Sequence, residues 1–347
     1  PTGSQKPNTA VPQAYFNKQE GVKKIFTETG AGQWGSSLAF AGQMFGIDIE
    51  VFMVKVSFDQ KPYRKLMMQA FDGTCHPSPS KLTDFGKKLL ADDPNNPGSL
   101  GIAISEAIES VVKSQGKAKY ALGSVLGHVL MHQTINGNEA ILQMEQAGDY
   151  PDIIVGCTGG GSNLAGLMFP FLGQQLRGGQ KIDIIGCEPL SCPSFTKGKY
   201  AYDHGDMARM TPLIKMHTLG SDFLPPANHS GGLRYHGMSY HLSHLYNLGL
   251  MRAKAYGQKD CFEAGVIFGK QEGIIPAPEA NHAVKGTIDA ALECKEKGES
   301  KTILFNLCGH GHFDMSAYDD YFNGRLADDF YDEVSANQSL SNLPKEF

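Results

Sequence analysis

Lys6 lies in a segment whose residue types suit amine chemistry. It follows the small pair Gly3-Ser4 and precedes Pro7, and Asn8 opens a predicted helix. An amine held on a stiff loop-to-helix corner and stripped of water has a lowered pKa, so it can attack a carbonyl and form a Schiff base. The alternative is that Lys6 is a solvated surface charge, as most lysines are.

A second candidate site is the run TGGGSN, which lies between a predicted strand and a predicted helix. Gly159, Gly160 and Gly161 allow consecutive N–H groups to point at one place, and Ser162 and Asn163 add side-chain donors. The run lacks the lysine of a nucleotide P-loop and the spacing of a dinucleotide fingerprint, so it favours a small phosphate monoester over ATP or NAD. A plain glycine-rich turn is the alternative.

The run ETGAGQWG repeats this strand–turn–helix pattern with an acid at the end of the strand. Backbone N–H groups and polar side chains in the turn can hold a substrate carboxylate, and Glu28 is placed to shuttle a proton. Alternatively, Glu28 only caps the turn. The predicted carboxylate loop consists of Thr29, Gly30, Ala31, Gly32 and Gln33.

Three further segments carry candidate polar groups. His310, His312 and Asp314 suggest a metal site, but flanking glycines and the lack of a third clear ligand favour a loop that lines a pocket, and we predict no metal. Glu279 is either a site acid or a stabilising acid near a helix start. Arg234 either clamps an anion or pairs with a surface acid.

The composition is that of an ordinary globular protein without a nucleic-acid or membrane partner. The net charge is −5, and no apolar run approaches the length of a membrane span. Seven cysteines, an odd number without a C-x-x-C pair, indicate reduced thiols. No basic-then-apolar signal segment opens the chain, so we expect a cytoplasmic protein. The start at Pro1, directly on the lysine segment, suggests a fragment.

Apolar strands that alternate with helices predict an α/β protein of two doubly wound domains with parallel sheets. We place an N-terminal domain at residues 1–130, a C-terminal domain at 131–326 and a mobile tail at 327–347. The predicted strands are 23–29, 50–56, 74–77, 152–157, 182–187 and 302–307. The predicted helices are 11–18, 33–46, 63–71, 102–112, 121–132, 138–147, one from 163, 259–271, 280–297 and 316–321. A turn at 136–137 separates the fifth and sixth helices, and 92–98 is a loop.

Four motifs together resemble the tryptophan synthase beta chain family of pyridoxal-phosphate enzymes. They are GSQKPNTA from Gly3, TETGAGQWG from Thr27, GGLRYHG from Gly231 and GHGHFD from Gly309. The resemblance extends to about Leu326. It implies a cofactor, pyridoxal 5'-phosphate, bound between the two domains.

The resemblance also implies a role for each candidate residue. Lys6 would be the Schiff-base lysine and Glu28 the catalytic acid and base. The turn from Thr29 to Gln33 would hold the amino-acid carboxylate, and Arg234 would belong to the substrate site. The implied cofactor contacts are Lys6, Gln5, Asn8, Gly159, Gly160, Gly161, Ser162, Asn163, Glu279 and Cys308, with Cys308 facing the pyridine nitrogen.

Three features depart from the family pattern. Gln5 stands where the family usually has histidine, and Cys308 stands where it usually has serine. The family also has some eighty residues before the lysine.

The implied reaction is replacement of the L-serine hydroxyl by indole, which gives L-tryptophan. A pyridoxal-phosphate serine or threonine dehydratase is one alternative, and a truncated, non-catalytic relative is another. The implied partners are L-serine, indole, a second copy in a homodimer and a tryptophan synthase alpha subunit, whose docking the sequence leaves open.

Overall fold

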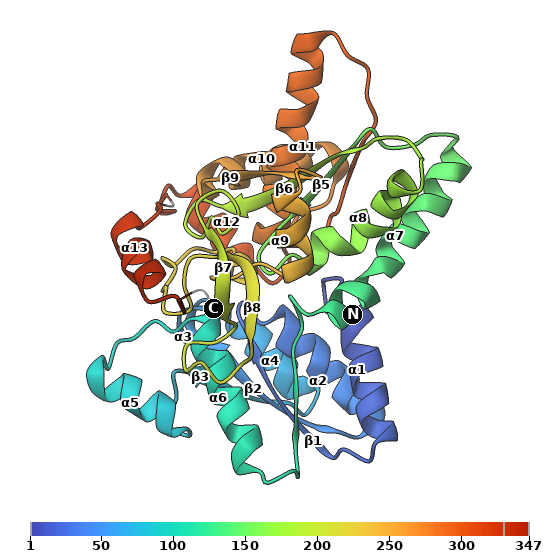
Figure 1. Ribbon diagram of the computed structural model, residues 1–347. Helices are drawn as coiled ribbons and strands as arrows, with labels where there is room; N and C mark the ends of the chain where they lie inside the picture. Colours follow the sequence, from blue (N-terminus) through green and yellow to red (C-terminus); the bar gives the residue numbers. More distant parts are fainter. Residues whose placement is uncertain (1, 329, 346–347) are drawn as a thin grey trace.

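The computed structural model describes residues 2–328 and 330–345. The chain forms two lobes, each built on one four-stranded sheet in which all neighbouring strands are parallel (Figure 1). The predicted fold class, α/β with two parallel sheets, is therefore confirmed.

The first lobe takes the N-terminal third of the chain. Its elements are α1 (Pro7–Gln19), β1 (Lys24–Thr29), α2 (Gln33–Phe45), β2 (Asp48–Val54), α3 (Lys55–Gln60), α4 (Pro62–Ala70), β3 (Thr74–Ser78), α5 (Asp84–Asp92), α6 (Leu100–Lys113) and β4 (Lys119–Ala121). The strand order is β3-β2-β1-β4. Val51 and Met53 of β2 face the α1–α2 side, whereas Phe52 and Val54 face α6. Both faces of the sheet are thus covered, as a buried parallel sheet requires.

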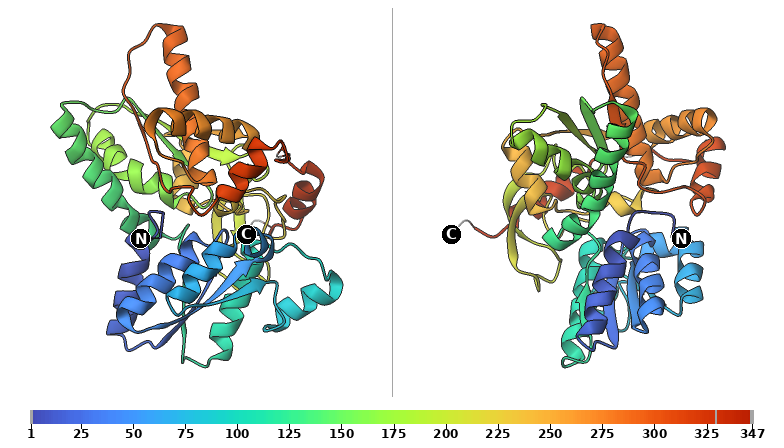
Figure 2. Two further views of the ribbon diagram at one scale, coloured as in Figure 1. Left: turned by 180° about the vertical axis from the view of Figure 1, so that it is seen from behind. Right: turned by 90° about the vertical axis from the view of Figure 1, so that its right-hand side faces the viewer.

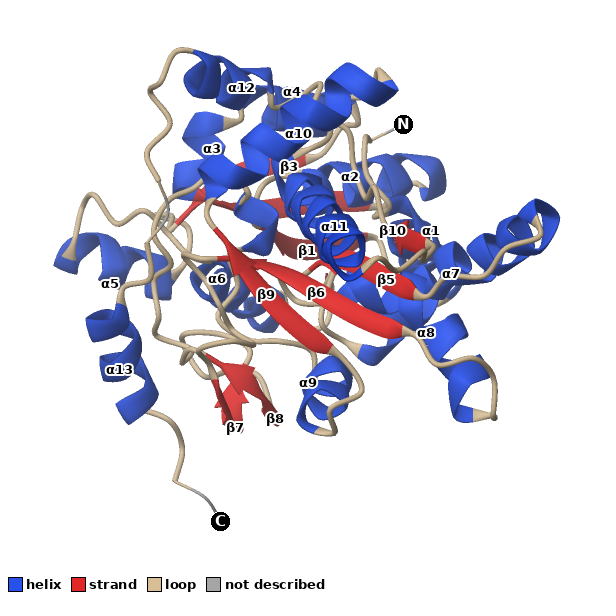
Figure 3. Cartoon of the chain, turned by 90° about the horizontal axis from the view of Figure 1, so that it is seen from above, coloured by secondary structure: helices blue, strands red, loops and turns tan. Residues whose placement is uncertain are grey.

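The second lobe follows the same plan with different helices. Its elements are α7 (Gly127–Ala147), β5 (Ile153–Cys157), α8 (Ser162–Leu176), β6 (Asp183–Pro189), β7 (Lys199–His204), β8 (Leu213–Thr218), the 3-10 helix η1 (Gly231–Leu233), α9 (Tyr240–Asn247), β9 (Arg252–Tyr256), α10 (Gln258–Glu272), α11 (Pro278–Lys297), β10 (Ile303–Phe305), α12 (Met315–Phe322) and α13 (Glu333–Ser341). The strand order is β10-β5-β6-β9 (Figure 3). Ile154 packs towards α8, and Val155 packs towards α11.

Helix α7 corrects one sequence prediction. Residues 121–132 and 138–147 were predicted as two helices with a turn at Asn136-Gly137, but α7 is continuous from Gly127 to Ala147. Gly137 serves helix packing instead, because a Cβ there would lie 2.4 Å from the carbonyl oxygen of Leu167 in α8. A Cβ on Gly166 would likewise lie 2.6 Å from the Cβ of Gln133. Helices α7 and α8 therefore cross close to Gly137 and Gly166, and Figure 2 shows the two helices side by side.

Several elements were missed because their sequences lack clear periodicity. The strand β4 and the antiparallel hairpin β7–β8 were not predicted, and only Ala121 of β4 fell inside a predicted element, the helix at 121–132. Helices α3, α5 and α9 and strand β9 were also missed.

The tail at 327–347 was predicted to be mobile, but it contains α13. Ala336 of this helix is fully buried against Cys192, Leu219 and Phe223. Tertiary packing on one small residue stabilises a helix whose own sequence is polar.

The domain boundary predicted near residue 130 falls inside α7. The strands of the first sheet end at Ala121 and those of the second begin at Ile153, so we keep two domains as a proposal. No helix in residues 2–328 and 330–345 is long and apolar enough to cross a bilayer.

The crossing of α7 and α8 gives a first prediction. Gly137→Ala should lower the midpoint of thermal unfolding, although alanine has a higher helix propensity by about 1 kcal/mol. The added methyl group must displace backbone of α8, which we expect to cost about 1–3 kcal/mol.

Gly173→Ala in α8 is the matched control. A Cβ there would meet its nearest neighbour, Nη1 of Arg177, at an ordinary 3.5 Å, so this variant should keep or raise the midpoint. Equal shifts in the two variants would contradict the assigned role of Gly137.

Candidate active site

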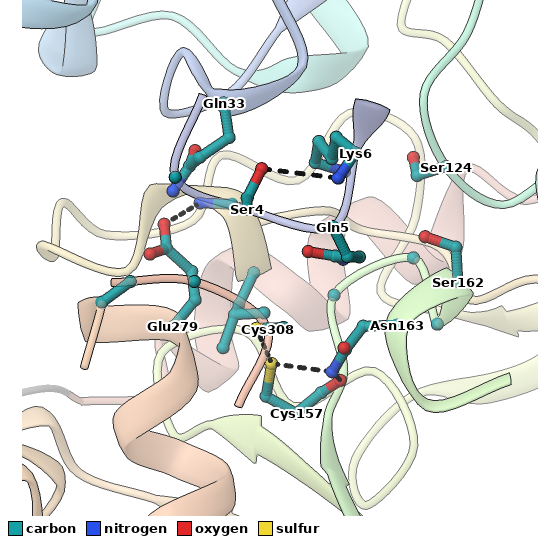
Figure 4. A pocket seen from close by; sticks show the side chains of 18 residues that line it. Ser4, Gln5, Lys6, Gln33, Ser124, Cys157, Ser162, Asn163, Glu279 and Cys308 are labelled. Atoms are coloured by element: carbon teal, nitrogen blue, oxygen red, sulfur yellow. Dashed lines mark hydrogen bonds between the residues drawn. The ribbon is translucent and has the colours of Figure 1, made fainter. Parts of the chain in front are cut away.

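The carboxyl ends of the two parallel sheets meet at two adjoining cavities, where ligands of open α/β sheets commonly bind. The cradle cavity, of about 540 Å³, contains the glycine run 159–161 and Cys308 (Figure 4). The Glu28 cavity, of about 430 Å³, contains Glu28 and the turn that follows β1. Both are lined by Lys6, Gln33, Ser124, Gly160 and Gly232.

Lys6 lies between the two cavities. It is the N-cap residue of α1, with Pro7 at the first helical position. The preceding segment is fixed to the second lobe, because the Gln5 N–H donates to the carbonyl of Cys308 at 3.1 Å. The Lys6 ammonium nitrogen donates to the carbonyl of Gly123, also at 3.1 Å. Lys6 is the one amine that lines either cavity in the described part of the chain.

Burial lowers the pKa of Lys6 below its ordinary value. Cys308, Glu279, Cys157 and Glu28 act in the opposite direction, but desolvation is the larger effect. A lowered pKa increases the fraction of neutral amine, which is the nucleophilic form.

The glycine run forms the N-terminus of α8. Gly161, the N-cap residue, has φ +96°, and a Cβ there would lie 2.3 Å from Cδ1 of Leu242. No side chain in the described residues caps this end of the helix. The first-turn N–H groups and the partial positive charge of the helix therefore suit a phosphate in the cradle cavity.

The turn after β1 has the same construction. Gly32, the N-cap residue of α2, has φ +97° and has no side chain of its own to cap the helix. The Thr29 hydroxyl accepts hydrogen bonds from the N–H groups of Gly32 and Gly35, both at 3.2 Å. Gly30, Ala31 and Gln33 join Thr29 in the wall of the Glu28 cavity. The helix end suits a carboxylate there.

Glu28 is 2% exposed at the end of β1. Burial raises its pKa to about 7, against the lowering effects of the Tyr120 hydrogen bond and of Lys6. A carboxyl group with this pKa can both give and take a proton near neutral pH.

Two thiols and a carboxylate lie at the other end of the cradle cavity. The sulfur atoms of Cys308 and Cys157 are 3.6 Å apart, and this contact together with burial raises the pKa of Cys157. Glu279 accepts a hydrogen bond from the Gly232 N–H at 2.9 Å. Asn163 lines the cavity while its amide donates to the carbonyl of Cys157 at 3.1 Å.

The structure does not bring every candidate residue to the cavities. The side chain of Gln5 lies in the cradle cavity, as does Ser162 (Figure 4). The amide of Asn8 instead donates to Asn136 of α7 at 3.0 Å, outside both sets of lining residues. Arg234 donates to the hydroxyl of Ser57 at 3.0 Å and borders a small separate pocket.

The rings of His310 and His312 pack against each other with centroids 4.4 Å apart and planes inclined by 40°. In residues 2–328 and 330–345, no group of three or more histidine, cysteine, aspartate or glutamate side chains is arranged to hold a metal ion.

Sequence reasoning missed Gly123 and Ser124, which line the cavities, and Tyr120 and Lys61, which contact site acids. Gly123 and Ser124 follow β4 and fell inside the helix predicted at 121–132, whereas Tyr120, within β4, was assigned to no element. Lys61, 3% exposed, bonds Asp314 at 2.6 Å and lies 4.0 Å from Glu279. The position of Lys61 next to a proline carried no signal for a buried ion pair.

Comparisons with known proteins agree with this geometry. A family model described as pyridoxal-phosphate dependent enzyme matches residues 1–309. Tryptophan synthase beta chain 2 of Aquifex aeolicus is 58% identical over 331 residues, 94% of this chain and 76% of the relative. Tryptophan synthase beta chain 2 of Thermotoga maritima is 57% identical over 92% of this chain and 75% of the relative.

The chain belongs to the tryptophan synthase beta chain family of pyridoxal-phosphate dependent enzymes. Solved structures agree with the fold alone. A threonine deaminase from the organism abbreviated T.th. has a TM-score of 0.62 at 17% identity, covering 90% of this chain and 84% of its own. An L-serine ammonia-lyase from Rhizomucor miehei has a TM-score of 0.66 at 14% identity, covering 94% and 90%.

The residues present fit pyridoxal phosphate. An aldehyde reacts with a neutral amine, which the lowered pKa of Lys6 favours, and a phosphate requires N–H donors, which the uncapped α8 supplies. A side chain on Gly160 or Gly161 would force the backbone of the cradle to shift, since a Cβ would lie 2.4 Å from Val125 or 2.3 Å from Leu242.

Gly161→Ala should therefore weaken cofactor binding. The methyl group would press on Leu242 and Met238, which are both buried, and would displace the helix N-terminus. We expect the cofactor dissociation constant to rise at least about tenfold, equivalent to about 1.4 kcal/mol, in a cofactor titration followed by absorbance.

Gly178→Ala provides the matched control. Gly178 has the same φ of +96°, but nothing lies within 4 Å of the added Cβ. Both variants should lose stability from left-handed backbone strain, by roughly 1–2 kcal/mol, but only Gly161→Ala should lose cofactor affinity. Unchanged affinity in Gly161→Ala would place the phosphate elsewhere.

Proposed function

We propose that this chain replaces the hydroxyl group of L-serine by indole, producing L-tryptophan and water. The observation that carries the proposal is a third, apolar cavity of about 1000 Å³ that adjoins the Glu28 cavity. Tyr120, which donates to Glu28, belongs to the wall of this apolar cavity. Tyr235 belongs to both walls.

The apolar cavity suits an aromatic nucleophile. Its lining comes largely from α6, β8 and the segment after β4, and includes Ile104, Ile108, Val111, Leu122, Ile214 and Met216. A mostly apolar pocket with a few polar groups at one end binds and orients a flat aromatic molecule while it excludes water. Water is the competing nucleophile, so its exclusion favours indole addition.

The chain's own groups divide the work of the reaction. Lys6 and the N-terminus of α8 would hold the cofactor, with Cys308 and Glu279 in the same cavity. When bound, the cofactor supplies an electron sink for the charge that develops at the amino-acid α-carbon. The N-terminus of α2 would hold the serine carboxylate, and Lys6 would take the α-proton.

Glu28 would then donate and accept the protons that are transferred during the replacement at the β-carbon. In its protonated form it gives a proton to the departing hydroxyl, and in its ionised form it can take a proton from the incoming nucleophile. A pKa of about 7 makes both forms available near neutral pH.

The alternatives are less well supported. In a dehydratase, water hydrolyses the product of elimination. Water needs no apolar binding site, so the dehydratase reading leaves the apolar cavity without a role. A non-catalytic relative would have no need for Lys6, Glu28 and the glycine cradle to meet in adjoining cavities. Homodimer formation, docking of an alpha subunit and a cytoplasmic location stay predictions from the resemblance.

Product analysis tests the proposal directly. With L-serine and saturating indole, tryptophan should exceed pyruvate as the product. Pyruvate as the main product under these conditions would favour the dehydratase.

Glu28→Gln tests the acid–base assignment. The variant should keep the cofactor absorbance but lose serine turnover by about 10²–10⁴-fold, because an amide cannot give a proton to the hydroxyl. In the wild type, the elimination rate should fall as pH rises through about 7, where Glu28 loses its proton. Unchanged turnover in the variant would contradict the assignment.

Glu188→Gln is the control for this variant. Glu188 is also fully buried with a pKa raised by burial to about 7, but it accepts hydrogen bonds from Phe195 and Thr196. It lies outside the lining of the three cavities, so serine turnover should stay near the wild-type rate.

A further inference from the structure

Tyr120 makes a hydrogen bond that the proposed chemistry has not yet used. Its hydroxyl donates to Oε2 of Glu28 at 2.5 Å. The parallel register brings the two together, because Tyr120 of β4 pairs with Phe26 of β1, two residues before Glu28. Side chains two residues apart on a strand share a face of the sheet, so Tyr120 and Glu28 are diagonal neighbours.

Tyr120 is the one side chain in residues 2–328 and 330–345 for which a hydrogen bond to the Glu28 carboxyl is found. The other ionisable groups that face Glu28 are Lys6, at the start of α1, and Tyr235, after η1. The hydroxyl of Tyr235 is engaged elsewhere, because it donates to the carbonyl of Gly205 at 2.8 Å. Besides a hydrogen bond from its own backbone, the Glu28 carboxyl is therefore oriented by Tyr120.

The direction of this bond has a chemical consequence. An oxygen that accepts a hydrogen bond from a phenol is the poorer place for a second proton, so protonated Glu28 carries its hydrogen on Oε1. Tyr120 lines the apolar cavity and Glu28 lines the neighbouring one, so Oε2 is held at the wall between them.

We propose that Tyr120 is a positioning residue, whose hydroxyl fixes the Glu28 carboxyl and leaves Oε1 as the oxygen that exchanges the proton with the substrate. The inference rests on the proposed role of Glu28. It goes beyond that role by explaining how one carboxyl presents the same oxygen as donor and as acceptor.

Tyr120→Phe in the holoenzyme tests the inference, because it removes the hydroxyl and keeps the ring in the wall of the apolar cavity. The hydrogen bond lowers the pKa of Glu28, so its loss should raise that pKa further above 7. The basic limb of kcat/KM for serine elimination should move to higher pH by roughly half to one unit. We expect kcat to fall about three- to tenfold with little change in KM for serine.

A second readout does not depend on turnover. The infrared carbonyl band of protonated Glu28, identified by its absence in Glu28→Gln, should titrate at higher pH in Tyr120→Phe than in the wild type. If that band keeps its midpoint while the wild type makes tryptophan, the function stands and the role of Tyr120 is overturned. If the wild type makes no tryptophan but the midpoint moves, the proposed function fails and the Tyr120–Glu28 coupling stands.

Tyr235→Phe is the matched control. It removes a buried tyrosine hydroxyl from the wall of the same apolar cavity, but that hydroxyl bonds Gly205 rather than Glu28. The infrared midpoint of Glu28 should move less in this variant than in Tyr120→Phe. Equal shifts would show a general effect of the cavity wall and would overturn the inference.

Discussion

The removal of Lys6 from water is the constraint on which the active site depends. Ser4 pairs with Gly309 across the lobes, which holds the start of α1 over the ends of both sheets. In water an amine and a carboxyl group are both charged at neutral pH. Burial lowers the pKa of Lys6 and raises that of Glu28 to about 7, so the two values move towards each other. Burial thereby favours the neutral form of the Lys6 amine and the protonated form of the Glu28 carboxyl.

Two helix N-termini of the same construction face this pair. One loop sets their separation, because a Cβ on Gly30 would lie 2.8 Å from the carbonyl oxygen of Gly231, and one on Gly159 would lie 2.7 Å from that of Gly232. The loop that contains Gly231 and Gly232 therefore passes between the two turns in direct contact with both. A single thickness of backbone therefore separates the turn of one lobe from that of the other.

The glycine turns and the lysine segment could be predicted from the sequence because their function depends on local backbone geometry. The strand-to-helix turns at Gly32 and Gly161 follow buried strands. The apolar strand and the glycine-rich turn can each be recognised in the sequence. Tyr120 could not be predicted, because its role comes from the register between β4 and β1, which is set by pairing over a long distance in the chain. The turn predicted at Gly137 was wrong for a related reason. A glycine favours a turn locally, but this one permits the close contact between α7 and α8.

A contrast between two buried carboxylates assigns their roles. Burial acts to raise the pKa of Glu279 as it does that of Glu28, but the charge of Lys61, together with hydrogen bonds from the Gly232 N–H, its own backbone and Gln33, offsets it, and the pKa of Glu279 is lowered. Lys61 is itself held by Asp314 at 2.6 Å. Glu279 therefore stays ionised as a fixed negative charge in the cradle cavity, whereas Glu28 exchanges its proton near neutral pH. Because the environments of the two acids move their pKa values apart, they favour the role in proton transfer that we propose for Glu28 and favour electrostatic support by Glu279.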